Sequence, residues 1–352
     1  MDADNCHEIV ELQAVYHKST SVVRTNGIMS EKFILKRGVR QGCVASPYLF
    51  TAIIDTVMRR ALDKYLGVPF GANGYLTDLT YADDIAFFAE SDTVATDMLH
   101  KLATTAKEYG LEINIEKTKV AATNLNTVQV HLNGTTIETV TSFKYLGSIV
   151  STVSADSSEE IDARIGQATG AFAALKWCLW KKRSISLSVK VRLFRGLVLP
   201  ILLYGCETWT LKVHSERKLE STLMRFLRSM VGVTRWHRIS NDTIRKYCSS
   251  QRSVMEMVRE RRLRWFGHVT RMGAERIPNQ LLWKEPWIGR KPRNAPRKIL
   301  ISHILKDVGR VSNIKDAGAL ALDRDIWKKV IQNPAGHQAP TATTGRLRPR
   351  RR

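Results

Sequence analysis

The sequence predicts an α+β fold over its first 150 residues, followed by an all-α and strongly basic region. Three observations support this: the order of apolar patterns, a Ser/Thr-rich stretch at 151–158, and the distribution of charge. Residues 1–176 hold 16 Lys and Arg against 21 Asp and Glu, whereas residues 177–352 hold 39 against 12. The net charges are therefore −5 and +27. A half this basic is typical of proteins that neutralise phosphates, so nucleic acid is the expected partner.

The first 150 residues alternate amphipathic segments with short apolar runs. A period of 3.6 residues predicts helices at 5–17, 48–66 and 92–109. Short apolar runs predict strands at 21–24, 32–36, 76–81, 85–90, 113–122, 128–132, 135–140 and 143–150. Asn26-Gly27 is a turn signal and Gly110 a helix C-cap signal. This order predicts an antiparallel sheet with helices packed on one face.

Beyond residue 151 the periodicity is helical. The predicted helices are 158–181, 187–203, 213–231, 240–248, 252–271, 298–309 and 315–332. Residues 285–298 are rich in Pro, Gly and Arg and predict a linker, and 333–352 predict a disordered basic tail. The expected domains are therefore 1–150, a helical region at 151–250, and a basic helical region at 251–332.

Cysteine usage and hydropathy indicate the compartment. The five cysteines are widely spaced and form no Cys-x-x-Cys pair, which favours reduced thiols in an intracellular protein. No run of 18 apolar residues occurs, so no membrane partner is expected. The run from Arg346 to Arg352 fits either a nuclear address or a phosphate-binding tail, and a nuclear location is expected.

Two adjacent carboxylates, Asp83 and Asp84, separate two apolar runs. A hairpin tip that exposes both to water would explain them without any function. A divalent metal is the alternative, because Mg²⁺ prefers oxygen ligands and is commonly held by one or two carboxylates together with substrate phosphates. Two such ions activate an attacking 3′-hydroxyl and stabilise the leaving pyrophosphate. The pair alone does not decide between these explanations.

The segments around the pair narrow the choice. They are, in order, Gly38-Val39-Arg40-Gln41-Gly42-Cys43-Val44-Ala45-Ser46-Pro47-Tyr48-Leu49-Phe50, Tyr81-Ala82-Asp83-Asp84, Gly110-Leu111-Glu112-Ile113-Asn114-Ile115-Glu116-Lys117-Thr118-Lys119 and Phe143-Lys144-Tyr145-Leu146-Gly147. Together they resemble the reverse transcriptase domain of non-LTR (LINE-like) retrotransposons, over about residues 10–150. The resemblance continues weakly through 203–209 and 264–269. It implies a partial polymerase palm, then an all-α thumb-like region and a basic C-terminal region.

The resemblance implies an RNA-directed DNA polymerase that joins deoxynucleoside triphosphates to a DNA primer on an RNA template. Asp83 and Asp84 would bind the catalytic Mg²⁺ ions, or Mn²⁺, and Tyr81 would pack beneath the primer end. The loop that begins at Gly38 would lie near the incoming nucleotide and the template base. Its expected contacts are Arg40, Gln41 and Gly42, although Arg40 fits a surface charge equally well.

Two further groups of residues take roles from the resemblance. A lysine near the triphosphate would act as a point charge or as a general acid, and Lys119 or Lys117 fits that place. A solvated strand end remains an alternative for both. Tyr145, Leu146 and Gly147 would form the primer grip, although Tyr145 and Leu146 also fit a core.

The segment 252–271 combines arginines with aromatic residues, which suits phosphate binding and base stacking. An amphipathic helix with its arginines in water is the alternative. The predicted nucleic-acid contacts are Arg259, Arg262, Arg264 and Trp265.

One departure from the family pattern affects the expected activity. The family places its first catalytic aspartate on a strand ahead of the segment at 5–17, and no matching strand occurs here. The fingers and an endonuclease region are also expected only in a longer form. We therefore expect weak or no synthesis by this chain alone, and the alternative function is a non-catalytic nucleic-acid-binding remnant of such an element.

Overall fold

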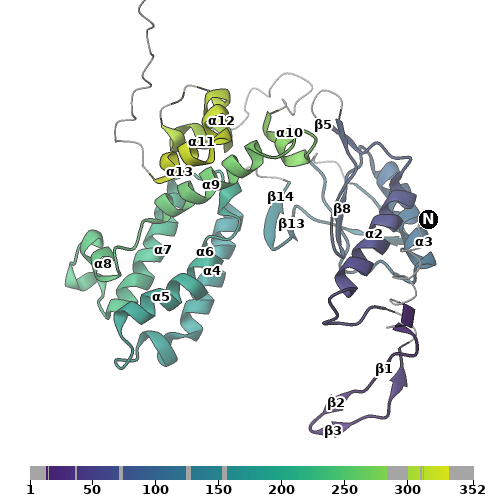
Figure 1. Ribbon diagram of the computed structural model, residues 1–352, viewed down its shortest axis with the longest axis horizontal. Helices are drawn as coiled ribbons and strands as arrows, with labels where there is room; N and C mark the ends of the chain where they lie inside the picture. Colours follow the sequence, from purple (N-terminus) through teal and green to yellow (C-terminus); the bar gives the residue numbers. More distant parts are fainter. Residues whose placement is uncertain are drawn as a thin grey trace, which may run out of the picture. The chain divides into compact units, whose positions relative to one another are not determined.

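The computed structural model describes residues 13–14, 16–35, 38–70, 74–123, 128–152, 157–283, 300–309, 311 and 313–332. The chain divides into two compact units (Figure 1). The first unit contains Met1–Val68, Tyr75–Val120 and Thr127–Thr139, and the second contains Pro69–Gly74, Ala121–Asn126 and Val140–Arg352. The linker expected at 285–298, the tail at 333–352 and most of the helix at 5–17 lie outside the described residues.

The first unit is built on two helices that lie side by side, α2 (Ser46–Leu62) and α3 (Asp92–Glu108) (Figure 1). Apolar residues at helical spacing, including Val57 and Met98, form the core between them. The Ser91 hydroxyl accepts a hydrogen bond from Val94 N at 3.3 Å and so caps α3. Both helices were predicted from their periodicity.

The strands of the first unit are shorter than predicted. They are β1 (Thr20–Ser21), β2 (Arg24–Thr25), β3 (Ile28–Met29), β4 (Phe33–Ile34), β7 (Asp78–Tyr81), β8 (Asp84–Phe87), β9 (Lys119–Val120), β10 (His131–Leu132), β11 (Thr135–Thr136) and β12 (Glu138–Thr139). The strands β5 (Val68–Phe70) and β6 (Gly74–Leu76) fall at the division between the two units. Over the described ranges they pair as separate two-stranded ladders and not as one sheet, and β9 pairs with β12 in parallel. The mixed α and β architecture is confirmed at this coarse level.

A side-chain turn shortens the strand predicted at 113–122. The Asn114 carboxamide accepts a hydrogen bond from Lys117 N at 3.0 Å, and its carbonyl accepts one from Thr118 N at 3.0 Å. Asparagine stabilises such turns by bonding its own backbone neighbours. Only Lys119–Val120 remains as a strand.

The second unit begins with the hairpin β13 (Ser142–Tyr145) and β14 (Ser148–Ser151) and continues as helices. The helices are α4 (Ser158–Ala174), α5 (Leu187–Leu197), α6 (Leu199–Leu202), α7 (Val213–Val231), α8 (Asn241–Tyr247), α9 (Val254–Thr270), α10 (Ile277–Trp283), α11 (Leu300–Val308), α12 (Ile314–Leu322) and α13 (Arg324–Gln332). Short helical turns occur at Lys176–Trp180, Cys206–Thr208 and Arg235–His237. The boundary expected after residue 150 falls near Val140, so the hairpin groups with the helices.

Three predicted helices are divided, each for a local reason. The segment 187–203 breaks at Val198, where Pro200 supplies no N–H to continue α5. The segment 315–332 breaks at Asp323, whose carboxylate accepts hydrogen bonds from Asp325 N and Ile326 N and caps α13. The segment 158–181 ends as a π-helical turn.

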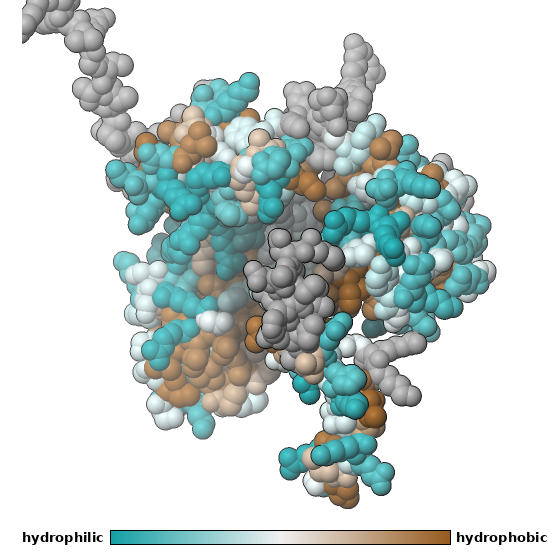
Figure 2. Space-filling model, turned by 45° about the vertical axis from the view of Figure 1, so that its right-hand side comes forward, coloured by the Kyte–Doolittle hydropathy of each residue, from teal (hydrophilic) through white to brown (hydrophobic). Residues whose placement is uncertain are grey.

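Two apolar clusters form the core of the second unit. The larger joins α4–α8 with the start of α9, and the smaller joins the rest of α9 to α11, α12 and α13. On the face shown in Figure 2, apolar side chains also gather over the lower part of the helical unit. Exposed apolar residues of this unit include Trp177, Leu197 and Val213. No helix among the described residues is long and apolar enough to span a bilayer.

Candidate active-site hairpin and nucleic-acid contacts

The two adjacent carboxylates lie at the tip of the β7–β8 hairpin. Tyr81 pairs with Asp84, so Ala82 and Asp83 form a two-residue turn. Ala82 has a φ of 53°, in the left-handed region that two-residue hairpin turns require at their first central position. The predicted strand–turn–strand is confirmed, and its turn projects both carboxylates into solvent.

The hairpin has two chemically different faces, because opposed residues of an antiparallel pair point to the same side. Ile85 and Phe87 of β8 pack against the apolar cluster between α2 and α3. Tyr81 and Asp84 point to the other side, where the Tyr81 side chain is 66% exposed. The helices α2 and α3 therefore pack against the face of the hairpin that carries Ile85 and Phe87, and the carboxylates remain accessible.

Two carboxylates fit part of a metal site. Oxygen ligands on a rigid turn suit Mg²⁺, which usually keeps several waters and binds through one or two carboxylates. Within the described ranges, no group of three His, Cys, Asp or Glu side chains is placed to hold a metal ion. Asp83 and Asp84 therefore stand as an incomplete ligand set in this part of the chain.

The loop that begins at Gly38 is held by one buried hydroxyl. Ser46 Oγ donates to Arg40 O at 2.6 Å and lies 2.7 Å from Tyr16 Oη. Gly42 has a φ of 86°, so a side chain there would be strained even though open space surrounds it. Arg40, Gln41 and Gly42 are all exposed, so the predicted nucleotide and template contacts are accessible.

The structure separates the two candidate lysines. Lys119 forms an ion pair with Glu138 across the parallel β9–β12 pair. Lys117 is exposed and its backbone N–H bonds Asn114. Within the described part of the chain, the Lys117 ammonium has no carboxylate partner, whereas that of Lys119 is paired with Glu138.

The predicted primer-grip residues form the second hairpin turn. Tyr145 pairs with Ser148, which leaves Leu146 and Gly147 as a two-residue turn with φ values of 48° and 85°. Positive φ at both central positions is typical of the turn that matches the twist of paired strands. Leu146 is 39% exposed, so its side chain is available at the tip.

This turn is clamped by side chains from the helices. Tyr204 Oη donates to Leu146 O at 2.8 Å, and Arg164 donates to Gly147 O. Arg164 Nε also donates to Glu160 Oε1 at 2.6 Å, and Glu160 Oε2 accepts from Ile149 N at 2.7 Å. The Arg164 guanidinium lies 4.5 Å from the centre of the Tyr204 ring. Hydrogen bonds that involve charged groups are the stronger kind, so the turn is held rigidly.

The sequence did not point to Glu160, Arg164 or Tyr204 as partners of the hairpin. Tyr204 lies in the segment 203–209, over which the family resemblance continues weakly, but the resemblance gave this residue no role. Glu160 and Arg164 are one helical turn apart, and both are 6% exposed. A buried charged pair at that spacing is unusual enough to be noticed once a helix is predicted.

The arginines of α9 mostly face inward. Arg259 donates to the carbonyls of Asp307, Val330 and Ile331, at the ends of α11 and α13. Arg271 donates to Ala321 O, at the end of α12, at 2.5 Å. Unsatisfied carbonyls at helix C-termini attract cations. These side chains therefore hold helices together.

Arg262 is 1% exposed, pairs with Asp307 at 2.6 Å and donates to Trp209 O at 3.2 Å. Its burial leaves no surface for the predicted contact with nucleic acid. Trp265 is partly buried against the smaller cluster. Of the four predicted contacts, Arg264 alone has an exposed side chain, at 68%, and it pairs with Glu260 at 2.5 Å. The predicted binding face on α9 thus reduces to Arg264.

Comparison with known proteins agrees with these features. Residues 1–150 match the family described as reverse transcriptase (RNA-dependent DNA polymerase). The chain is 30% identical over 274 residues to an uncharacterized transposon-derived protein of Caenorhabditis elegans. The aligned segment covers 73% of this chain and 95% of that protein. It is 24% identical over 234 residues, or 62% of its length, to the RNA-directed DNA polymerase from mobile element jockey of Drosophila funebris. It is 31% identical over 106 residues, or 30% of its length, to the retrovirus-related Pol polyprotein from a type-2 retrotransposable element of Drosophila melanogaster.

The chain belongs to the reverse transcriptase family, in the group of non-LTR retrotransposons. It spans 24% of the length of the jockey polymerase and 10% of the Pol polyprotein.

Proposed function

We propose that this chain carries the metal-binding hairpin of an RNA-directed DNA polymerase and extends a DNA primer on an RNA template. The observation that carries the proposal is the β7–β8 turn, which holds Asp83 and Asp84 in solvent on a hairpin supported from behind by α2 and α3. An exposed acidic turn on a rigid support places oxygen ligands without the cost of burying them.

In this proposal Asp83 and Asp84 bind Mg²⁺ or Mn²⁺. When bound, the ions would lower the pKa of the primer 3′-hydroxyl and neutralise the leaving pyrophosphate. Tyr81 lies on the same face as Asp84, so its ring would support the primer end. The exposed loop residues Arg40 and Gln41 would contact the nucleotide or the template. Lys117 would face the triphosphate more readily than Lys119, whose ammonium is paired with Glu138.

The proposal includes weak synthesis by the 352-residue chain. Two carboxylates bind a pair of divalent cations more weakly than three carboxylates do, because less negative charge offsets the repulsion between the two ions. Among the described residues, no third His, Cys, Asp or Glu side chain completes a metal-binding group with Asp83 and Asp84.

Primer extension tests this function. The full chain, an RNA template, a labelled DNA primer and deoxynucleoside triphosphates would be incubated with Mg²⁺ or Mn²⁺, beside the Asp83→Asn and Asp84→Asn variants. Weak extension that either substitution abolishes would support the proposal. Extension that survives both substitutions would place the reaction elsewhere. Complete absence of extension and of Mn²⁺ binding would favour the second candidate, a non-catalytic nucleic-acid-binding protein, which the net charge of +27 over residues 177–352 supports independently.

A further inference from the structure

Trp236 is the most exposed large apolar side chain of the described residues, at 91%. It lies in the helical turn Arg235–His237, between α7 and α8. A capping box closes the turn: the His237 ring accepts from Thr234 N at 3.1 Å and lies 2.9 Å from the Thr234 hydroxyl. The backbone around the indole is therefore ordered while the indole itself faces water.

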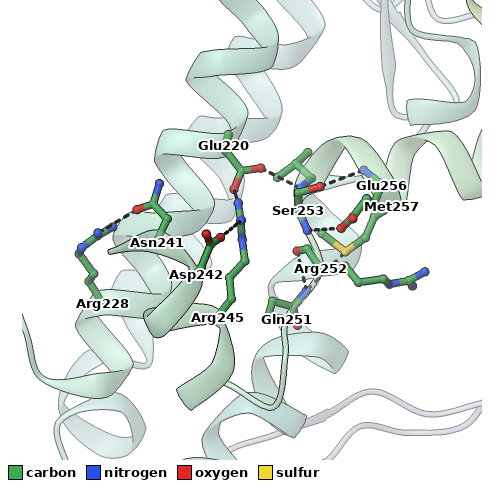
Figure 3. A network of polar contacts seen from close by, with 11 residues as sticks. Glu220, Arg228, Asn241, Asp242, Arg245, Gln251, Arg252, Ser253, Glu256 and Met257 are labelled. Atoms are coloured by element: carbon green, nitrogen blue, oxygen red, sulfur yellow. Dashed lines mark hydrogen bonds and ion pairs between the residues drawn. The ribbon is translucent and has the colours of Figure 1, made fainter. Parts of the chain in front are cut away.

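Both ends of this turn are fixed to helices. Arg235 donates to Ser221 Oγ of α7 at 3.0 Å. On the other side, Arg228 of α7 donates to Ile239 O at 3.0 Å. It also donates to Asn241 Oδ1 at 2.8 Å (Figure 3). These bonds hold the chain immediately before and after the indole. Its exposure is therefore a property of the fold and does not come from a loose loop.

The position of α8 is fixed in the same way. Arg245 of α8 forms an ion pair with Glu220 of α7 and a second one, at 3.3 Å, with Asp242 (Figure 3). Glu220 also accepts from Val254 N, at the first turn of α9, at 2.9 Å. Glu220 and Asp242 are thus both engaged with Arg245.

Further arginines lie on α7 and on the turn that carries Trp236. Arg217, Ser221 and Arg225 are spaced four residues apart, so they share one face of α7, and this is the face that Arg235 contacts. Arg238 follows the indole with a φ of 52°. Among the residues that the structure describes, Arg217, Arg235 and Arg238 have no carboxylate within ion-pair distance.

We propose that this surface, formed by Trp236, Arg217, Arg235 and Arg238, binds single-stranded nucleic acid. The indole stacks on an unpaired base, and the guanidinium groups bind neighbouring phosphates. A duplex offers its bases only at their edges, so a lone exposed indole suits a strand whose bases are unstacked. The surface does not involve Asp83 or Asp84, so its binding is independent of the proposed polymerase reaction.

The test is fluorescence anisotropy of a labelled 20-nucleotide single strand with the full chain, in EDTA so that metal-dependent chemistry plays no part. Trp236→Ala should weaken binding about tenfold, the loss of one base stack, while Trp236→Phe keeps most of the affinity. The matched control is Trp177→Ala, because Trp177 is also 74% exposed and lies in the same unit. That control should bind as the unsubstituted protein does. Because both indoles face solvent, the thermal midpoints should not change.

A second measurement addresses the phosphates. Arg238→Ala should reduce the slope of log Kd against log salt concentration by about one phosphate contact, about 0.7 for a single strand. The proposal is overturned if Trp236→Ala binds as tightly as the unsubstituted protein. It is also overturned if Trp177→Ala shows the same loss, or if a duplex of equal length binds as tightly as the single strand with the same dependence on Trp236.

Discussion

The indole of Trp327 lies against the backbone of α9 at Gly267. A Cβ added at Gly267 would be 2.5 Å from Trp327 Cδ1 and closer still to Nε1. The same indole donates to Leu263 O at 2.9 Å, one turn earlier on α9. Gly318 of α12 stands in a similar relation to Trp283 of α10. At both places the absence of a side chain on glycine lets an indole approach the helix backbone closely. Because Gly267 lies within the segment 264–269, this segment has a role in packing.

Gly267→Ala should lower the free energy of unfolding by about 1–3 kcal/mol, because the added methyl overlaps Trp327 in a filled core. Gly166 of α4 is the matched control, since a Cβ there meets nothing within 4 Å. Gly166→Ala should raise the free energy of unfolding by about 0.5–1 kcal/mol through its helix propensity. Urea denaturation measures both, and equal effects of the same sign would contradict the packing argument.

Arg262→Ala should destabilise the second unit by about 3–5 kcal/mol, because it leaves the Asp307 carboxylate largely buried without its partner. Arg264→Ala should change stability by less than about 0.5 kcal/mol, because its ion pair with Glu260 is largely exposed on the arginine side. Thermal unfolding distinguishes the two. A stable Arg262→Ala protein with weakened nucleic-acid affinity would restore the role predicted for this arginine.

Tyr204→Phe should increase hydrogen exchange in the 142–151 hairpin, because it removes only the hydroxyl that donates to Leu146 O. The expected loss of stability is about 1 kcal/mol. Tyr247→Phe is the control, since Tyr247 is 54% exposed on α8. Exchange measured by mass spectrometry should be unchanged in the control. An equally protected hairpin in Tyr204→Phe would show that the clamp does not hold the turn.

Asp83→Asn and Asp84→Asn should leave the thermal midpoint unchanged, or raise it slightly, because both carboxylates are exposed and repel each other. Both substitutions should also weaken Mn²⁺ binding, which electron paramagnetic resonance can follow. Asp78→Asn is a nearby control on the same hairpin. If only Asp78→Asn lost Mn²⁺ binding, the metal would bind near Asp78 and not at the Asp83–Asp84 turn.

The thiols should divide into two classes. Burial raises the pKa of the Cys206 thiol to about 12 and that of Cys248 to about 11. Hydrogen bonding, first from the Ala45 backbone, lowers the pKa of the Cys43 thiol. In a Cys6→Ser background at pH 8, a disulfide reagent should modify Cys43 and the exposed Cys178 quickly, and the other two only after unfolding. Rapid modification of all four in the native protein would contradict this.

The same shifts predict how stability depends on pH. In the folded protein the Cys206 and Cys248 thiols stay protonated above the pKa of about 8.5 that an unfolded thiol has. Their contribution to stability is therefore complete below about pH 8.5 and is lost as the pH rises toward 11 and 12. Urea midpoints at pH 7, 9 and 10.5 should fall in that order, and Cys248→Ala should reduce the fall.

Several helices and the acidic hairpin follow from local patterns. The segments 92–109 and 213–231 were predicted within one residue of α3 and α7, because periodicity and caps lie within the segment itself. The divisions at Val198 and Asp323 were missed, although Pro200 and an aspartate able to cap a helix were readable signals. The strands came out short because ladders depend on partners far away in the chain.

The sequence by itself determined the family, the Tyr81–Asp84 turn and the basic character of residues 177–352, since ordered motifs and charge can be read without a fold. The tertiary structure alone decided which cations are free. Arg259 donates to a carbonyl at a helix end and Arg262 pairs with a carboxylate, whereas the Arg238 side chain is exposed to solvent. The physical reason is that a guanidinium binds whichever carbonyl or carboxylate packing brings to it, and residue spacing does not specify that partner.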